Sequence, residues 1–154
     1  MMTLREQKNS AATLIRILSL MLALLLLAGC GSQVGTESVE ETETEMILEI
    51  NGEAADVTWE DNEAVTALKE HLPIDISMSM YGGFEQVGPV GFSVPADDKN
   101  LTTEPGDIVL YSGDQIVVFY GSNTWAYTKL GKINMPIKEL ERLLGNGDVS
   151  LTLR

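Results

Sequence analysis

The chain has a single cysteine and a single histidine among its 154 residues. An intrachain disulfide would need a second cysteine, so the fold has to be stable through packing alone. Zinc sites built from cysteine and histidine are also excluded, because Cys30 and His71 are the only such residues. We expect no metal site, and no motif in the chain predicts another cofactor.

Long apolar runs are scarce as well. The one pronounced run covers residues 15–28, which is shorter than the ~20 residues that a membrane-spanning helix needs. Arg5, Lys8 and Arg16 form a basic start around its beginning, and small residues close it. This order is typical of a secretory signal peptide, so residues 1–29 are excluded from the folded domain.

The end of this apolar run carries a second signal. Residues 27–30 read Leu-Ala-Gly-Cys, which resembles the lipobox of bacterial lipoproteins. In that family the cysteine is lipidated and becomes the first mature residue. The resemblance implies an extracytoplasmic protein, anchored to the bacterial cell membrane or envelope through lipid on Cys30. Residues 30–45 then form an acidic flexible linker, because glutamate, serine and threonine dominate them.

Basic residues are in a clear minority. The chain has 10 lysine and arginine against 23 aspartate and glutamate residues, and removing residues 1–29 leaves 7 against 22, a net charge of −15. Such a surface repels phosphate backbones, which excludes nucleic acid as a partner. It also argues against electrostatic adhesion to anionic lipid, so the acylated Cys30 is the expected contact with the membrane.

Residues 46–154 form one predicted domain, and short strands dominate it. Two helices are predicted, one over residues 62–72 capped by Asp61, the other opened by Pro136 and ended by Gly145. Hairpin turns are predicted at residues 51–52 and 112–114. Apolar alternation and short apolar runs predict strands at 46–50, 55–59, 74–80, 92–94, 107–111, 115–120, 125–133 and 149–153. About eight strands and two short helices indicate a mainly β fold, a small closed or nearly closed barrel.

Several segments of this domain resemble the bacterial cyclophilin-like domain family. They are residues 80–85 (Met-Tyr-Gly-Gly-Phe-Glu), 90–93 (Val-Gly-Phe-Ser), 105–111 (Pro-Gly-Asp-Ile-Val-Leu-Tyr), 117–125 (Val-Val-Phe-Tyr-Gly-Ser-Asn-Thr-Trp) and 130–133 (Leu-Gly-Lys-Ile). The resemblance covers nearly all of residues 46–154. It implies a small β-barrel with a helix near each end, in agreement with the predicted elements.

Cyclophilins proper are peptidyl-prolyl isomerases, in which an arginine within a Phe-His-Arg segment polarises the prolyl amide. This chain has no such segment, and beyond the signal peptide its only arginines are Arg142 and Arg154. Neither matches the catalytic position, so no catalytic residue is predicted. The chain is therefore expected to be a non-catalytic module that binds a peptide or small ligand. Two alternatives stay open: an isomerase with a divergent active site, and an accessory subunit of an exported redox or transport system.

Aromatic residues beside glycines indicate where such a ligand would bind, because glycine permits close approach of the backbone. The expected contacts come from two segments, with Tyr81, Gly82, Gly83 and Phe84 in the first and Tyr120, Ser122, Asn123 and Trp125 in the second. The alternative is that the aromatic side chains fill the core and that Ser122 and Asn123 serve a turn. Two further readings are not favoured: a triad of Ser93 and His71 with an aspartate, and carboxylate pairs among Asp97, Asp98, Glu104 and Asp107.

Overall fold

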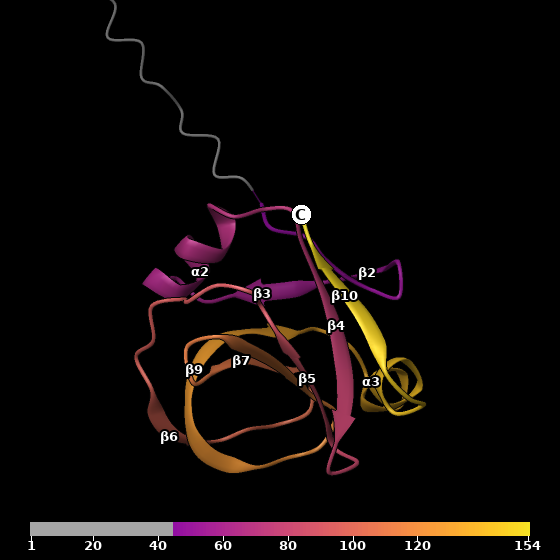
Figure 1. The fold of residues 1–154 in the computed structure, drawn as a ribbon. Coiled ribbons are helices and arrows are strands. Elements are labelled where there is room, and N and C mark those ends of the chain that lie inside the picture. Colours follow the sequence, from indigo (N-terminus) through magenta and orange to yellow (C-terminus); the bar gives the residue numbers. More distant parts are fainter. Residues whose placement is uncertain (1–44) are drawn as a thin grey trace, which may run out of the picture. The chain divides into compact units, whose positions relative to one another are not determined.

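The computed structural model describes residues 45–154, so the signal peptide, Cys30 and the linker up to residue 44 lie outside the described residues. The described part contains two helices, α2 (Glu63–Lys69) and α3 (Ile137–Leu144), and ten strands (Figure 1). The strands are β1 (Leu48–Ile50), β2 (Glu53–Ala55), β3 (Val57–Trp59), β4 (Ile74–Tyr81), β5 (Glu85–Pro89), β6 (Lys99–Thr102), β7 (Asp107–Tyr111), β8 (Gln115–Phe119), β9 (Thr124–Ile133) and β10 (Val149–Leu153).

The strands form one sheet that nearly closes on itself. Its order is β2-β1-β10-β4-β5-β8-β7-β9-β3, with β6 paired to β9. The two ends of this path, β2 and β3, are separated in the chain by Asp56 alone, so one stretch of chain pairs with β1 first and with β9 next. The Trp59 indole N–H also donates to the Met46 carbonyl oxygen at 2.7 Å. The predicted mainly β, nearly closed barrel is confirmed.

The number and placement of strands differ from the sequence prediction. The single strand predicted over 55–59 is divided at Asp56, where Asn134 N–H donates to the Asp56 carbonyl oxygen at 2.8 Å. Residues 92–94 are not a strand, and two strands, β5 and β6, occur where glycine-rich and polar loops were predicted. The structure therefore has ten strands in place of about eight.

Tight turns set the register of three hairpins. The central pairs Asn51-Gly52, Gly82-Gly83 and Ser112-Gly113 all have positive φ angles, between 52° and 80°. This pairing of left-handed residues suits the right-handed twist of antiparallel strands. The turns predicted at 51–52 and 112–114 are confirmed. Gly82 and Gly83, predicted as part of a ligand site, connect β4 to β5.

Both helices occur where the sequence placed them, with different ends. Asn62 caps α2, not Asp61: its Oδ1 accepts from the Val65 N–H at 2.9 Å, whereas Asp61 is exposed. The helix ends at Lys69, three residues before the predicted end, and β4 begins only a few residues later. Pro136 is the N-cap of α3 and Gly145 its C-cap.

Alternate residues of β7 and β8 contribute to two separate apolar cores. Ile108 and Leu110 belong to the barrel core, which also contains buried residues of α2 and α3, whereas Val109 belongs to a second core. Because side chains alternate between the faces of a strand, the second core lies on the opposite face of the sheet. It consists of Val109, Val117, Phe119 and Tyr127, with Phe84, Val87, Leu101 and Tyr111 packed against them.

Strand β9 connects these two cores. Its first half pairs with β6, and its second half pairs with β7 and β3. The register with β7 shifts between Ile108 and Val109, and β9 follows a strongly curved path (Figure 1). This curvature brings Tyr127 against Phe119 and Tyr111, over the second core.

Candidate functional site

A cavity of about 290 Å³ opens over the second core, on the face of β5, β7 and β8 that is opposite the barrel core. We refer to it as the aromatic cavity. Four of the lining side chains are aromatic, and they come from three different strands. The full lining is Tyr81, Glu85, Val87, Tyr111, Gln115, Val117, Asn123, Trp125 and Tyr127.

The aromatic cavity has a fixed inner wall and an exposed rim. Tyr127 is buried, and its ring packs edge-on against Tyr111, with ring centroids 6.0 Å apart. Its hydroxyl accepts from Asn123 Nδ2 at 3.1 Å. At the rim, Tyr81 is 68% exposed and Trp125 is 58% exposed. The rim of the site therefore exposes aromatic surface to solvent, and its inner wall consists of side chains that packing and hydrogen bonds hold in place.

Asn123 is held by a residue that sequence reasoning missed. Thr103 is completely buried, and its hydroxyl oxygen accepts from the Asn123 N–H at 2.9 Å. The same hydroxyl lies 3.1 Å from the Asn123 carbonyl oxygen, which also accepts from the Thr103 N–H at 2.8 Å. These contacts fix Asn123 directly before β9, the strand from which Trp125 and Tyr127 line the aromatic cavity.

The carboxyl group of Glu85 is the most unusual feature of the aromatic cavity. Glu85 is 5% exposed, and its Oε2 is buried without a hydrogen-bond partner. Burial raises the pKa of this carboxyl above its ordinary value, because removal from water disfavours the charged form. Burial and, secondly, the charge of Glu85 raise the pKa values of the Tyr120 and Tyr127 phenols.

The structure brings three of the eight predicted ligand residues together. Tyr81, Asn123 and Trp125 line the aromatic cavity. Phe84 lies in the second core and stacks on Phe119, with ring centroids 6.5 Å apart. The others do not line it: Gly82 and Gly83 form a turn, Ser122 is exposed, and Tyr120 is buried in the barrel core with no partner for its hydroxyl.

Sequence reasoning missed Glu85, Tyr111 and the role of Tyr127 as the inner wall. Glu85 was seen only as the end of the segment Tyr-Gly-Gly-Phe-Glu. In the sheet it pairs with Tyr81 on β4 and with Phe119 on β8. The alternation over Glu85 and Val87 is the signal that would have placed both on the face of Tyr81.

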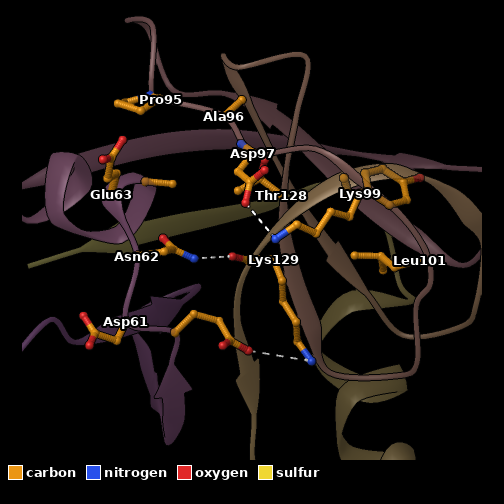
Figure 2. A pocket seen from close by; sticks show the side chains of 13 residues that line it. Asp61, Asn62, Glu63, Pro95, Ala96, Asp97, Lys99, Leu101, Thr128 and Lys129 are labelled. Atoms are coloured by element: carbon orange, nitrogen blue, oxygen red, sulfur yellow. Dashed lines mark hydrogen bonds and ion pairs between the residues drawn. The ribbon is translucent and has the colours of Figure 1, made fainter.

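A second, larger hollow of about 650 Å³ lies beside the start of α2 (Figure 2). We refer to it as the α2 cleft; residues 95–101 and β9 form its other walls, and Tyr127 lines both hollows. Figure 2 shows that polar groups in the cleft already pair with one another. Lys99 Nζ lies 2.7 Å from Asp97, Lys129 Nζ lies 3.9 Å from Glu60, and Asn62 Nδ2 donates to the Lys129 carbonyl oxygen at 2.9 Å.

The carboxylates considered from sequence as possible pairs have other partners in the structure. Asp98 accepts from the Thr128 hydroxyl at 2.6 Å. Asp107 accepts from the Glu104 N–H at 2.8 Å, and Glu104 lies 2.9 Å from Lys132 Nζ. The Lys132 ammonium holds the pKa of Glu104 below its ordinary value. These groups stabilise loops and do not form a carboxylate pair.

Within residues 45–154, the hydrogen bond of the His71 ring is to the backbone and not to Ser93. His71 is exposed beyond the end of α2, and its Nδ1 lies 2.8 Å from the Ala67 carbonyl oxygen. Its ring stacks on Phe92, with centroids 4.1 Å apart. Residues 45–154 contain no group of three or more His, Cys, Asp or Glu side chains placed to hold a metal ion. None of the helices in that range has the length and hydropathy that a membrane crossing requires.

Comparison with known proteins identifies the family. A family model described as the cyclophilin-like family matches residues 48–154. The chain belongs to the cyclophilin-like family. This confirms the family predicted from the sequence segments. Membership does not settle the activity, because one fold hosts many functions.

Among solved structures, this cyclophilin-like chain is similar to one described as McbB in complex with tryptophan. The TM-score is 0.50 and the identity 13%, over 71% of this chain and 44% of that chain. The cyclophilin-like chain thus spans less than half the length of that protein, and the likeness shows the fold alone. No curated protein matches the chain.

The arginines of this family member lie away from the aromatic cavity. Arg142 on α3 pairs with Glu53 at 2.9 Å, and Arg154 pairs with Glu49. These are the two arginines within the part of the chain that the structure describes, and neither lines the cavity.

Proposed function

We propose that this protein is a membrane-tethered, extracytoplasmic binding module and that the aromatic cavity takes a small molecule or a single peptide side chain. One observation carries the proposal: a buried carboxyl group with an unpartnered oxygen lines a cavity that four aromatic residues also line. An isolated buried polar group is costly, and a ligand that bonds to it removes that cost. The α2 cleft is less suited, because its polar groups have partners within the protein.

The size of the aromatic cavity supports a small occupant. Its volume of about 290 Å³ lies at the lower limit of ordinary ligand pockets, which start near ~300 Å³. A long peptide would extend over the exposed rim formed by Tyr81 and Trp125. Apolar contact with the rings would supply affinity, and Glu85 and Asn123 would orient the ligand.

The lining also supports binding without catalysis. Among the described residues that line the cavity, Glu85 alone has a carboxyl group, and none is a lysine, arginine or histidine. Nucleophilic or acid–base catalysis usually needs a second group within hydrogen-bond reach, such as a histidine beside a serine. Acceleration of prolyl isomerisation by the purified protein, lost on substitution of Glu85 or Trp125, would contradict this part of the proposal and favour the divergent isomerase.

Trp125→Ala is expected to weaken binding about 30-fold while leaving the fold intact. A buried contact with a tryptophan ring commonly contributes ~2 kcal/mol to affinity, whereas the side chain is 58% exposed in the free protein. Calorimetric titration with a panel of charged and neutral fragments, including blocked single amino acids and tryptophan, measures the effect. Ile137→Ala is the matched control, because Ile137 is 50% exposed on α3 and does not line the cavity. The proposed site would be wrong if the two variants lost affinity equally, or if the parent protein bound none of the fragments.

The tether rests on the lipobox resemblance of residues 27–30. Cys30→Ser is expected to move most of the protein out of the membrane fraction or to leave the leader uncleaved, because serine provides no thiol for the lipid. Each buried methylene of an acyl chain contributes ~0.8 kcal/mol to membrane binding, so two chains anchor firmly. Fractionation and mass spectrometry of the parent protein and the variant check this. An unmodified Cys30 in the parent protein, with residues 1–29 still attached, is the contrary result.

A further inference from the structure

We infer that the aromatic cavity selects an organic cation, a protonated amine or a quaternary ammonium group, with Glu85 as its counter-charge. This inference rests on the proposed binding function and names the class of ligand. Three features support the inference. The Glu85 carboxyl has an oxygen without a hydrogen-bond partner, four aromatic residues line the same cavity, and few other side chains in the lining could bind a metal ion.

Among the described residues, the buried carboxyl of Asp107 has lysine side chains beside it, whereas the buried carboxyl of Glu85 has none. Asp107 is 4% exposed, and its Oδ1 lies 3.6 Å from both Lys129 Nζ and Lys132 Nζ. Glu85 is buried to the same extent, yet no lysine, arginine or histidine lines the aromatic cavity. A buried carboxylate is stable only when it is paired. Among residues 45–154 no basic side chain pairs with Glu85 in the cavity, so the carboxyl is either protonated or paired with a cation that a ligand supplies.

The aromatic residues suit such a charge. Tyr81, Tyr111, Trp125 and Tyr127 line the same cavity as Glu85. The negative faces of aromatic rings attract cations, and desolvated contacts of this kind contribute ~2 kcal/mol. A neutral apolar ligand would gain only area burial and would leave Glu85 unpaired. An anionic ligand would be repelled by Glu85 and by the strongly acidic chain.

A metal ion is a poor alternative occupant. Calcium and magnesium require about six oxygen ligands, whereas the lining offers the Glu85 carboxyl beside neutral amides and phenols. The other side chains of the cavity lining are largely aromatic or aliphatic, and a hydrated metal ion gains little binding energy from them. An alkylammonium group carries the same sign of charge with an apolar exterior, and it matches both parts of the site.

The pH dependence follows from the groups around Glu85. The phenols of Tyr81, Tyr111 and Tyr127, from β4, β7 and β9, line the cavity with Glu85. The Tyr120 phenol lies in the barrel core, close enough for the charge of Glu85 to raise its pKa. Burial raises the pKa of Glu85, so acid protonates it before ordinary glutamates. The affinity for a permanent cation is therefore expected to rise as the pH rises through this raised pKa, and to level off above it.

Choline and its uncharged carbon isostere 3,3-dimethylbutan-1-ol provide the test, with 3,3-dimethylbutanoate as the anion. The three have similar shape, and calorimetric titration of the purified protein compares them. We expect choline to bind at least ~10-fold more tightly than the alcohol, the loss on removing one desolvated cation contact, and the acid not to bind. Choline affinity should also fall on acidification, although choline itself does not titrate.

Glu85→Gln is expected to lower the choline affinity ~10-fold or more, because it removes the counter-charge, and to change that of the alcohol less than ~2-fold. Glu53→Gln is the matched control, since it makes the same change in net charge at an exposed position on β2. The comparison of choline with the alcohol on the parent protein stands even if the variant does not fold. Equal or tighter binding of the alcohol or the acid would overturn the inference and leave the proposed function standing. If choline, the alcohol and the acid all fail to bind while other fragments bind, the inference is overturned and the proposed function stands. If no fragment binds at all, the inference and the proposed function are both overturned.

Discussion

Gly106→Ala is expected to lower the free energy of unfolding by about 4 kcal/mol, the sum of backbone strain and a steric clash. Gly106 has a φ angle of +92°, and an added Cβ would lie 2.7 Å from the Ile133 carbonyl oxygen. The surrounding backbone has little room to move away. The Gly106 N–H donates to Phe119 and its carbonyl accepts from the Ile133 N–H, both at 2.8 Å. Urea denaturation followed by circular dichroism measures the loss.

Gly91→Ala separates the two causes of this loss. Gly91 has nearly the same φ angle, +94°, but a Cβ added there would meet no atom within 4 Å. The variant should therefore suffer the backbone strain alone, about 1–2 kcal/mol. A similar loss in the two variants would mean that the contact with Ile133 is relieved by local movement. The packing account of Gly106 would then be wrong.

Gln86→Leu is expected to cost about 3 kcal/mol of stability, because it leaves the Leu144 carbonyl and the partly buried Gly147 carbonyl without this donor. Gln86 on β5 is fully buried, and its Nε2 donates to the Leu144 carbonyl oxygen at 2.6 Å and to that of Gly147 at 2.7 Å. These bonds attach the end of α3 and the following turn to the barrel. Leucine is not smaller than glutamine, so the substitution leaves no cavity and the loss reports the missing hydrogen bonds.

Gln115→Leu makes the same chemical change without the same loss. Gln115 is half-buried at the aromatic cavity, and its side chain makes no hydrogen bond within residues 45–154. The change in stability should stay within about 0.5 kcal/mol. Thermal denaturation of both variants under one set of conditions gives the comparison. If Gln86→Leu proves as mild as its control, the attachment of α3 through Gln86 contributes little.

Local sequence signals predicted the elements whose pattern is complete within a few residues. Strand β4 was predicted almost to its ends, because Ile74, Ile76 and Met78 alternate with polar residues and one face alone is buried. The turn at Asn51-Gly52 was predicted because this dipeptide tolerates two positive φ angles. Helix α3 was predicted from its apolar face together with the proline before it and the glycine after it.

Strands β5 and β6 were not predicted from the sequence, and the reason differs between the two. The run Glu85–Pro89 contains glycine, proline and two polar residues, which are typical of a loop. Gln86 is buried there only because the end of α3 accepts its hydrogen bonds. The run Lys99–Thr102 is polar and largely exposed, and it is a strand because the first half of β9 is available for pairing. The end of α3 lies far from β5 in the sequence, and the first half of β9 lies far from β6.

The candidate site divides in the same way. Tyr81, Asn123 and Trp125 were predicted because aromatic and polar residues beside glycines mark loops at which ligands approach. Glu85 and Tyr111 became part of the site only when β4, β5, β8 and β7 aligned. An acidic residue in a chain with 23 of them is usually solvated, and nothing local distinguishes the buried one.

The sequence by itself determined the family, the barrel class, the hairpin turns and the expectation of a lipid tether, because each depends on composition or on short motifs. Only the tertiary structure decided which carboxyl group is buried without a partner and which aromatic residues surround it. Burial is a property of neighbours, and the neighbours of Glu85 come from strands that lie up to 42 residues away in the chain, at Tyr127. Sheet register, and not local propensity, therefore placed the carboxyl group in the aromatic cavity.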